Sequence, residues 1–152
     1  MRSKVPLTVL VVLTVTTIPA CASGFDDKVF DQQSIDALKA RASQAQPREQ
    51  CFLYAQLVHQ MTEVSLRKYA EGDVEKATDL LKQIQQLSRK IHLSMADDNK
   101  RLKNSEILLR HTAFRLTEML HNSRFEDRPL VEQTLSQVNE AQNEAMMQVF
   151  RK

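Results

Sequence analysis

The chain is 152 residues long, and its composition argues against several classes of protein. Lys and Arg together number 21, Asp and Glu 19, and aromatic residues make up only 5% of the chain. A nucleic-acid-binding domain needs a surplus of cationic side chains, usually beside aromatic ones, so we expect no nucleic-acid partner. The length suits one ordinary domain with a sizeable core.

Residues 1–22 have the three-part layout of a secretory signal. Arg2 and Lys4 give a positive start, residues 5–18 form an apolar run, and small residues follow. The run is shorter than the roughly 20 residues that a transmembrane helix needs, so we expect its removal. Removal takes both basic residues with it and leaves 19 basic against 19 acidic side chains, which is no net charge.

The stretch around the end of this signal contains two alternative cleavage patterns. Ala20 and Ala22 fit the small-residue pockets of an ordinary signal peptidase, which would make Ser23 the first residue of the mature chain. The sequence IPAC at 18–21 resembles the lipobox of bacterial lipoproteins, in which Cys21 would carry lipid. The layout favours cleavage after Ala22 and an exported, periplasmic or secreted protein. A lipoprotein anchored to a membrane through Cys21 is the alternative.

The second cysteine has no cysteine partner in the mature chain once Cys21 is removed or lipidated. We therefore expect Cys51 to be a free thiol, buried as a small hydrophobic side chain on a helix face. An intermolecular disulfide in an oxidising compartment is the alternative.

Few helix breakers follow the signal, and this predicts long helices. The glycines and prolines after residue 22 are Gly24, Pro47, Gly72 and Pro129. No alternation typical of strands appears, so we expect one all-α domain over residues 34–152, an antiparallel bundle of about four main helices preceded by a short one. Residues 23–33 are expected to be loose, and residues 34–46 to form the short helix with Ser34 as its cap.

The first long helix is predicted to begin at Pro47, because Pro fits the first turn, where its missing N–H costs nothing. One face carries small or apolar side chains at three- and four-residue spacing: Cys51, Tyr54, Ala55, Val58, Met61, Ser65 and Tyr69. Gly72 can adopt the left-handed conformation that ends a helix, and Asp73 can cap the next helix.

Residues 74–122 keep one heptad phase throughout, as in a coiled coil. The stripe consists of Ala77, Leu81, Ile84, Ser88, Ile91, Met95, Asp98, Leu102, Ser105, Leu109, Thr112, Leu116 and Met119. The sequence ADDN at 96–99 can separate two helices, which gives the four-helix bundle. Alternatively residues 74–122 form one continuous helix in a three-helix arrangement, since no Pro interrupts them.

The last helix is predicted from about Arg128, after a break at residues 122–129. Its apolar face carries Val131, Leu135, Val138, Ala145 and Val149. Residues 89–115 hold seven basic and three acidic side chains, whereas residues 126–148 hold five acidic and one basic. We expect these stretches to lie on neighbouring helices of one bundle. The alternative is a basic docking patch for an acidic partner or anionic lipid.

Motifs that carry chemistry are scarce in this chain. It has no Gly-x-Ser-x-Gly elbow, no Gly-rich phosphate loop and no His-Glu-x-x-His, so we expect no catalytic residues, no cofactor and no enzymatic activity. His59 and His92 lie at the edges of their stripes and could meet across two helices, which makes them the candidates for a transition-metal site. A haem held by one Met and one His is a further alternative.

Taken together, these features predict an exported, non-enzymatic helical module that binds another protein or a component of the cell envelope. A homodimer is compatible with the pattern, and membrane contact is expected only through the signal or a lipid on Cys21. The alternative function is a haem- or metal-binding bundle of the periplasm.

We expect the mature chain to begin at Ser23. The measurement is the intact mass of the mature protein recovered from separated soluble and membrane fractions. A soluble chain that starts at Ser23 agrees with cleavage after Ala22, whereas an acylated chain starting at Cys21 in the membrane fraction would establish the lipoprotein alternative.

Overall fold

The computed structural model describes residues 32–94 and 99–151, and of these the side chains of residues 99 and 100 are not described. It contains the helices α1 (Gln32–Gln44), α2 (Pro47–Ala70), α3 (Val74–Leu93), α4 (Asn99–Asn122) and α5 (Arg128–Phe150), and no strand occurs in these ranges. The predicted all-α domain of four main helices and a short N-terminal helix is confirmed.

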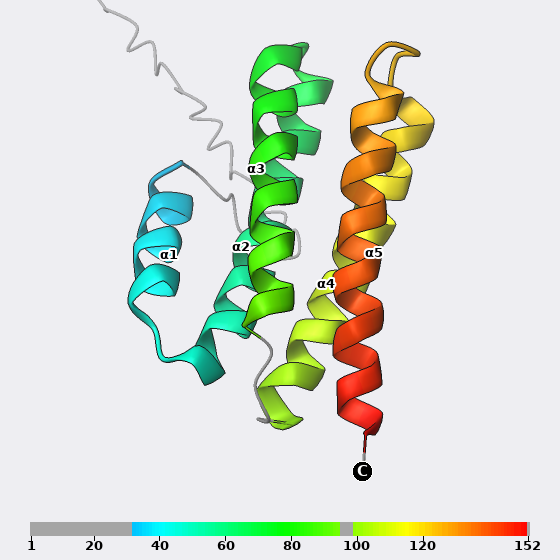
Figure 1. The fold of residues 1–152 in the computed structure, drawn as a ribbon. Helices are drawn as coiled ribbons and strands as arrows, with labels where there is room; N and C mark the ends of the chain where they lie inside the picture. The colour runs from blue at the N-terminus through cyan, green and yellow to red at the C-terminus, as the bar shows by residue number, and fades with distance from the viewer. Residues whose placement is uncertain (1–31, 95–98, 152) are drawn as a thin grey trace, which may run out of the picture.

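The four main helices form two antiparallel hairpins that stand side by side (Figure 1). One hairpin is α2–α3 and the other is α4–α5, and both run in the same sense, so that α2 packs on α4 and α3 on α5. The short helix α1 packs on α2. Contacts between the hairpins keep a nearly constant offset in the sequence: Glu63 binds Arg115, 52 residues further on, and His59 binds Thr112, 53 residues further on.

The alternative of one continuous helix over residues 74–122 is wrong. Helix α3 ends at Leu93, and α4, from Asn99, returns in the opposite direction beside α2. In a single helix the two stretches would point the same way. The heptad phase is shared because both helices turn the same kind of stripe toward one core, not because they are joined.

The heptad stripes lie in the core as predicted. In α4 the buried side chains are Leu102, Ser105, Leu109, Thr112, Leu116 and Met119, and in α5 they are Val131, Thr134, Val138, Ala141 and Ala145. The predicted Leu135 and Val149 of α5 are only partly buried and pack against the edge of the core. Of the stripe over 74–122, Met95 and Asp98 lie outside the described residues.

Hydroxyl groups in this core are satisfied locally. Thr62, Ser88, Ser105, Thr112 and Thr134 each donate a hydrogen bond to the carbonyl four residues earlier in their own helix, and Ser123, just after α4, donates to the Met119 carbonyl of that helix. Ser65 of α2 donates instead to the Ala77 carbonyl of α3, at 2.9 Å. A buried hydroxyl with such a partner avoids the cost of desolvation without a hydrogen bond, so Ser and Thr can occupy heptad positions.

More of the surface of α2 is buried than the predicted stripe from Cys51 to Tyr69 accounts for. Besides the stripe it buries Leu53, Leu57 and Val64. The reason is its position, since α2 packs against α1, α3 and α4. The buried Ile35 and Ala42 show which side of α1 meets this surface. Cys51 is buried and free, and burial raises the pKa of its thiol.

Three of the predicted helix signals are confirmed and one is wrong. Pro47 opens α2, Gly72 has a φ of 85°, and the Asp73 carboxylate accepts a hydrogen bond from the backbone N–H of Lys76. Ser34 is not a cap, because α1 already begins at Gln32 and includes the last two residues of the segment expected to be loose.

The signal and cleavage predictions cannot be compared with this fold. Cys21, Ala22 and Ser23 lie outside the described residues. Among the helices that are described, none combines the length and the apolar character needed to cross a membrane.

Replacing Gly72 by Ala is expected to lower the free energy of unfolding by about 1 kcal/mol, because an L side chain disfavours positive φ. A Cβ at this position would meet no atom within 4 Å, so the cost is conformational. Urea unfolding measures it. Glu71→Ala is the control, because Glu71 has ordinary helical angles. A loss for Gly72→Ala no larger than that of the control would contradict this account of the turn.

Candidate binding groove between α3 and α5

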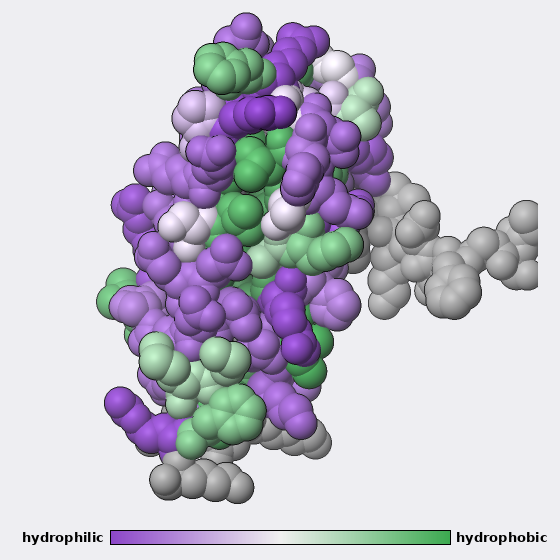
Figure 2. Space-filling view, turned by 90° about the vertical axis from the view of Figure 1, so that its right-hand side faces the viewer, coloured by the Kyte–Doolittle hydropathy of each residue, from purple (hydrophilic) through white to green (hydrophobic). Residues whose placement is uncertain are grey.

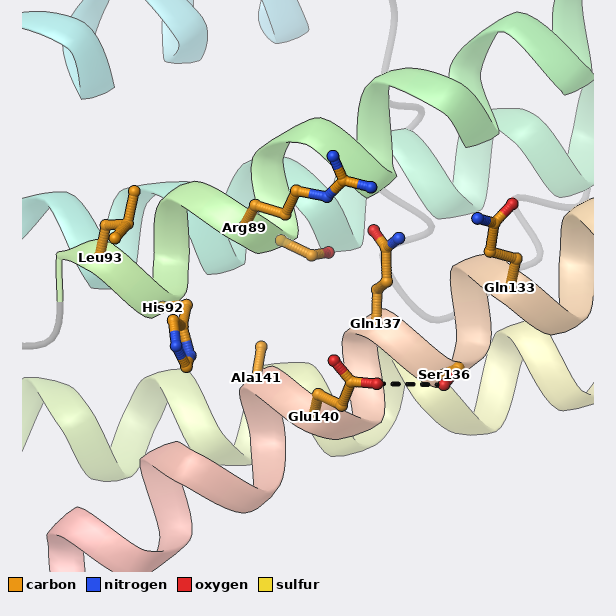
Figure 3. Close-up of a pocket in the computed structure, with 9 residues that line it drawn as sticks. Arg89, His92, Leu93, Gln133, Ser136, Gln137, Glu140 and Ala141 are labelled. Carbon is orange, nitrogen blue, oxygen red and sulfur yellow. Dashed lines mark hydrogen bonds between the residues drawn. The ribbon is translucent and has the colours of Figure 1, made fainter.

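A hollow of about 520 Å³ lies along the surface where α3 and α5 meet (Figure 3). Its lining consists of Ser88, Arg89, His92 and Leu93 from α3 and Gln133, Ser136, Gln137, Glu140 and Ala141 from α5. The two helices run in the same direction here, so each contributes successive turns to the same length of surface.

Small side chains create this hollow, and polar contacts border it. Ser88 and Ala141 are both buried at the seam, and neither has the volume to fill the space between the helices. One turn before Ser88, the Gln85 amide donates to the Thr134 hydroxyl at 2.9 Å. One turn after it, the imidazole of His92 contacts the carboxylate of Glu144. Polar contacts therefore join α3 to α5 on both sides of Ser88 along the helix.

Several polar groups of the hollow are not used by the fold. The Gln137 side-chain oxygen is buried and has no hydrogen-bond partner. Arg89 is exposed and forms no ion pair within the described part of the chain. In Figure 3 both side chains reach into the opening from opposite helices. Glu140 accepts a hydrogen bond from Ser136 at 3.3 Å.

A second hollow, of about 540 Å³, continues the first toward the C-terminal end of α5. It shares His92 and Glu140 with the first and adds Asn143, Glu144, Met147, Gln148 and Arg151. Met147 is 64% exposed, and nearby Leu93 is 84% exposed. We call the two hollows together the α3–α5 groove. Its lining is mostly polar, with the exposed apolar side chains of Leu93 in the first hollow and Met147 in the second.

The two predicted metal-site histidines lie in different seams. His59 lies between α2 and α4, with Nδ1 3.2 Å from the Thr112 hydroxyl. His92 lies in the α3–α5 groove against Glu144. Within the described ranges, no group of three or more His, Cys, Asp or Glu side chains is placed to hold a metal ion.

The α2–α4 seam contains a charged cluster that the sequence analysis did not single out. The Arg115 guanidinium donates two hydrogen bonds to the Glu63 carboxylate, at 2.7 and 2.9 Å, and also binds Glu118. These carboxylates raise the pKa of Arg115, so it stays charged. The pairing is bidentate, which fixes orientation as well as distance, and it holds the hairpins in register.

His59 is kept neutral in the same seam. Burial lowers its pKa, and the positive Arg115 and nearby His111 act in the same direction, against the opposing effect of Glu63. The Thr112 hydroxyl donates its hydrogen bond to the Leu108 carbonyl, so toward His59 it can only accept one. His59 must therefore donate its Nδ1 proton to Thr112, which leaves Nε2 as the unprotonated nitrogen.

Of the groove residues, the sequence analysis singled out only His92, and as a metal-site candidate, because the others belong to no recognised motif. The charge difference between residues 89–115 and 126–148 was the nearest signal, and among the described ion pairs only His92–Glu144 joins those stretches. Comparison with known proteins adds nothing here, since no family model, no curated protein and no solved structure matches this chain.

The stability of the fold is expected to fall as the pH drops below about 6.5, the ordinary pKa of His. The folded state keeps His59 neutral to lower pH than the unfolded state does, so the unfolded chain binds more protons in that interval. The contribution of neutral His59 is therefore complete above the ordinary pKa and is lost as the pH falls toward the folded pKa.

The measurement is the urea midpoint between pH 7.5 and about 5, for the unchanged protein and for His59→Gln, whose amide can still donate to Thr112. We expect a flatter pH dependence for His59→Gln. His121→Gln is the control, because His121 is exposed and bonds within its own helix. Equal slopes for His59→Gln and the unchanged protein would show that His59 does not carry this dependence.

Proposed function

We propose that this protein is an exported, non-enzymatic helical module that binds another protein through the α3–α5 groove. The observation that carries the proposal is the buried Gln137 oxygen without a partner, at the edge of an open hollow. A buried polar atom that lacks a hydrogen bond costs free energy, and a partner that supplies a donor removes that cost.

The surroundings of the groove support a protein partner. Leu93 lines the first hollow and Met147 the second, and these side chains are 84% and 64% exposed; Phe150, near the end of α5, is 77% exposed. Exposed apolar side chains that gather beside a polar groove are typical of protein-binding surfaces. The face of the molecule seen in Figure 2 is mostly hydrophilic, with apolar side chains showing along its middle, near its top and at its lower end.

Groups with a shifted pKa lie away from the groove. In the described part of the chain these are Cys51, His59, Tyr69 and Arg115. Burial is the main cause for Cys51, His59 and Tyr69, and the hydrogen bond to Glu63 is the main cause for Arg115. Export rests on the signal layout of residues 1–22.

The haem- or metal-binding alternative has no specific observation in its favour. Met61 and Met119 are buried in the core, where packing explains them, and Met146 and Met147 lie on the surface of α5. Met95 lies outside the described residues.

Site-specific photo-crosslinking of the full-length protein in its native cells tests the proposal. A benzoylphenylalanine at Ser136, on the rim of the groove, should give one discrete adduct, whose second component is identified by mass spectrometry and then shown to bind as a purified protein. Lys82 is the control position, because it is 61% exposed on α3 and does not line the groove.

The adduct at Ser136 is expected to weaken in Gln137→Ala, with unchanged helical content. Identical adducts from Ser136 and Lys82 would count against the groove as the binding surface. A purified protein that turns over a substrate, or that contains stoichiometric cofactor, would overturn the proposed function itself.

A further inference from the structure

We infer that two copies of this chain associate through the outer face of α5, with the two α5 helices antiparallel about a two-fold axis. The outer face is the stripe that points away from the core and consists of Glu132, Ser136, Asn139, Asn143, Met146 and Phe150. In each copy, Met146 and Phe150 enter a hollow on α5 of the other copy. This contact is additional to the partner binding proposed above and does not depend on it.

The outer face has the spacing of a helix-packing surface although no described helix covers it. Helix α5 lies at the edge of the bundle and packs on α3 and α4 only, among the described helices (Figure 1). The residues of the outer face follow one another at alternating intervals of four and three, and all are exposed except the partly buried Asn139. This spacing keeps side chains on one side of a helix and is the pattern with which helices pack on each other.

The first half of the outer face forms a shallow hollow of about 430 Å³. Its lining consists of Glu132, Leu135, Ser136, Asn139, Glu140 and Asn143. These positions make two overlapping sets with the spacing i, i+3, i+4 and i+7, one from 132 to 139 and one from 136 to 143. Four residues so placed form the hole that receives one side chain of a facing helix in knobs-into-holes packing. The hollow therefore fits two successive side chains of a helix that lies along α5.

The second half of the same face carries two side chains that can fill these holes. Met146 is 38% exposed and Phe150 is 77% exposed, and both are large and apolar. They are four residues apart, and the centres of the two holes are also four residues apart, so both side chains can enter at once. One helix thus carries both halves of a contact, which is what a self-complementary two-fold interface requires.

The antiparallel direction is the one that brings these halves together in both copies. In a parallel pair Phe150 would face Phe150, and both hollows would stay empty. In an antiparallel pair Phe150 enters the hole from 132 to 139 and Met146 enters the hole from 136 to 143. Both contacts require the same register, which places the two-fold axis beside Asn143. There the two Asn143 amides face each other, and each has a donor and an acceptor for the other.

Charges at the two ends of the outer face agree with this direction. Glu132 and Arg151 are exposed, and neither forms an ion pair within the described part of the chain. In this register Arg151 of one copy lies about one helical turn from Glu132 of the other. Glu144 is not part of the contact, because it lies against His92 of α3. A contact through one helix of each copy is small, so we expect a dissociation constant in the micromolar range.

Sedimentation velocity of the mature protein, from low to several hundred micromolar, tests the association. We expect the sedimentation coefficient to rise from that of a monomer to that of a dimer. Phe150→Ser removes the larger knob and Ser136→Arg fills the hollow, and each is expected to weaken the dimer about tenfold. Phe125→Ser and Gln86→Arg are the controls, because both residues are exposed and lie outside the outer face. Unchanged urea midpoints show that the variants are folded.

A short thiol-specific cross-linker tests the direction of the two helices. Asn143→Cys is expected to link two copies, because residue 143 lies beside the axis. Glu132→Cys is expected to give no link, since the two residues 132 are about 33 Å apart along the helices. The unchanged protein is the control, because its Cys51 is buried. A parallel dimer would be linked at both positions.

A protein that stays monomeric over the whole concentration range overturns the dimer. A dimer that neither Phe150→Ser nor Ser136→Arg weakens, or one that is linked through Glu132→Cys, overturns the outer face as its antiparallel contact. These results leave the proposed partner binding standing, because that binding uses the α3–α5 groove. If the photo-adduct formed at Ser136 in cells is instead a second copy of this chain, the dimer is supported and the proposed function fails.

Discussion

The parallel register of the two hairpins is the constraint on which the rest of the structure depends. Leu102, Leu109 and Leu116 of α4 enter the core, and the bidentate pair of Glu63 with Arg115 joins α2 to α4 across a separation of 52 residues. Once α4 lies beside α2 in the same direction, the antiparallel return of α5 places it beside α3, also in the same direction. The α3–α5 groove thus follows from a contact on the opposite side of the bundle.

The two seams between the hairpins use their polar groups differently. Between α2 and α4, Glu63, Arg115 and Glu118 satisfy one another, and His59 is bonded to Thr112. Between α3 and α5 there is contact at Gln85–Thr134 and at His92–Glu144, with the small Ser88 and Ala141 between them. Large side chains in place of these two would close the surface, so the opening results from their size.

The sequence predicts the helices well because their signals are local. The helix-starting Pro47, the positive φ at Gly72 and the cap at Asp73 are each read from one or two residues. Pairing is harder to predict, because a heptad stripe shows which side of a helix is buried but not which helix covers it. Residues 74–122 were therefore compatible with one continuous helix, and the second buried side of α2 was missed. The groove depends on pairing, so the sequence could single out His92 but not the side chains from the other helix that line the same hollow.

Nearly every buried hydroxyl of this fold donates a hydrogen bond to a carbonyl of a helix. The few buried polar atoms that lack a hydrogen-bond partner are therefore exceptions that call for an explanation. Heptad-position Ser and Thr side chains such as Ser88 and Thr134 are bonded to carbonyls one turn back. Gln137 is different, because its oxygen is buried beside an opening rather than inside a packed seam. The same helix ends in exposed Met147 and Phe150, so one surface combines an unmet hydrogen bond with unburied apolar area. The proposed binding of another protein at this surface would cover the apolar area and can be tested as described above.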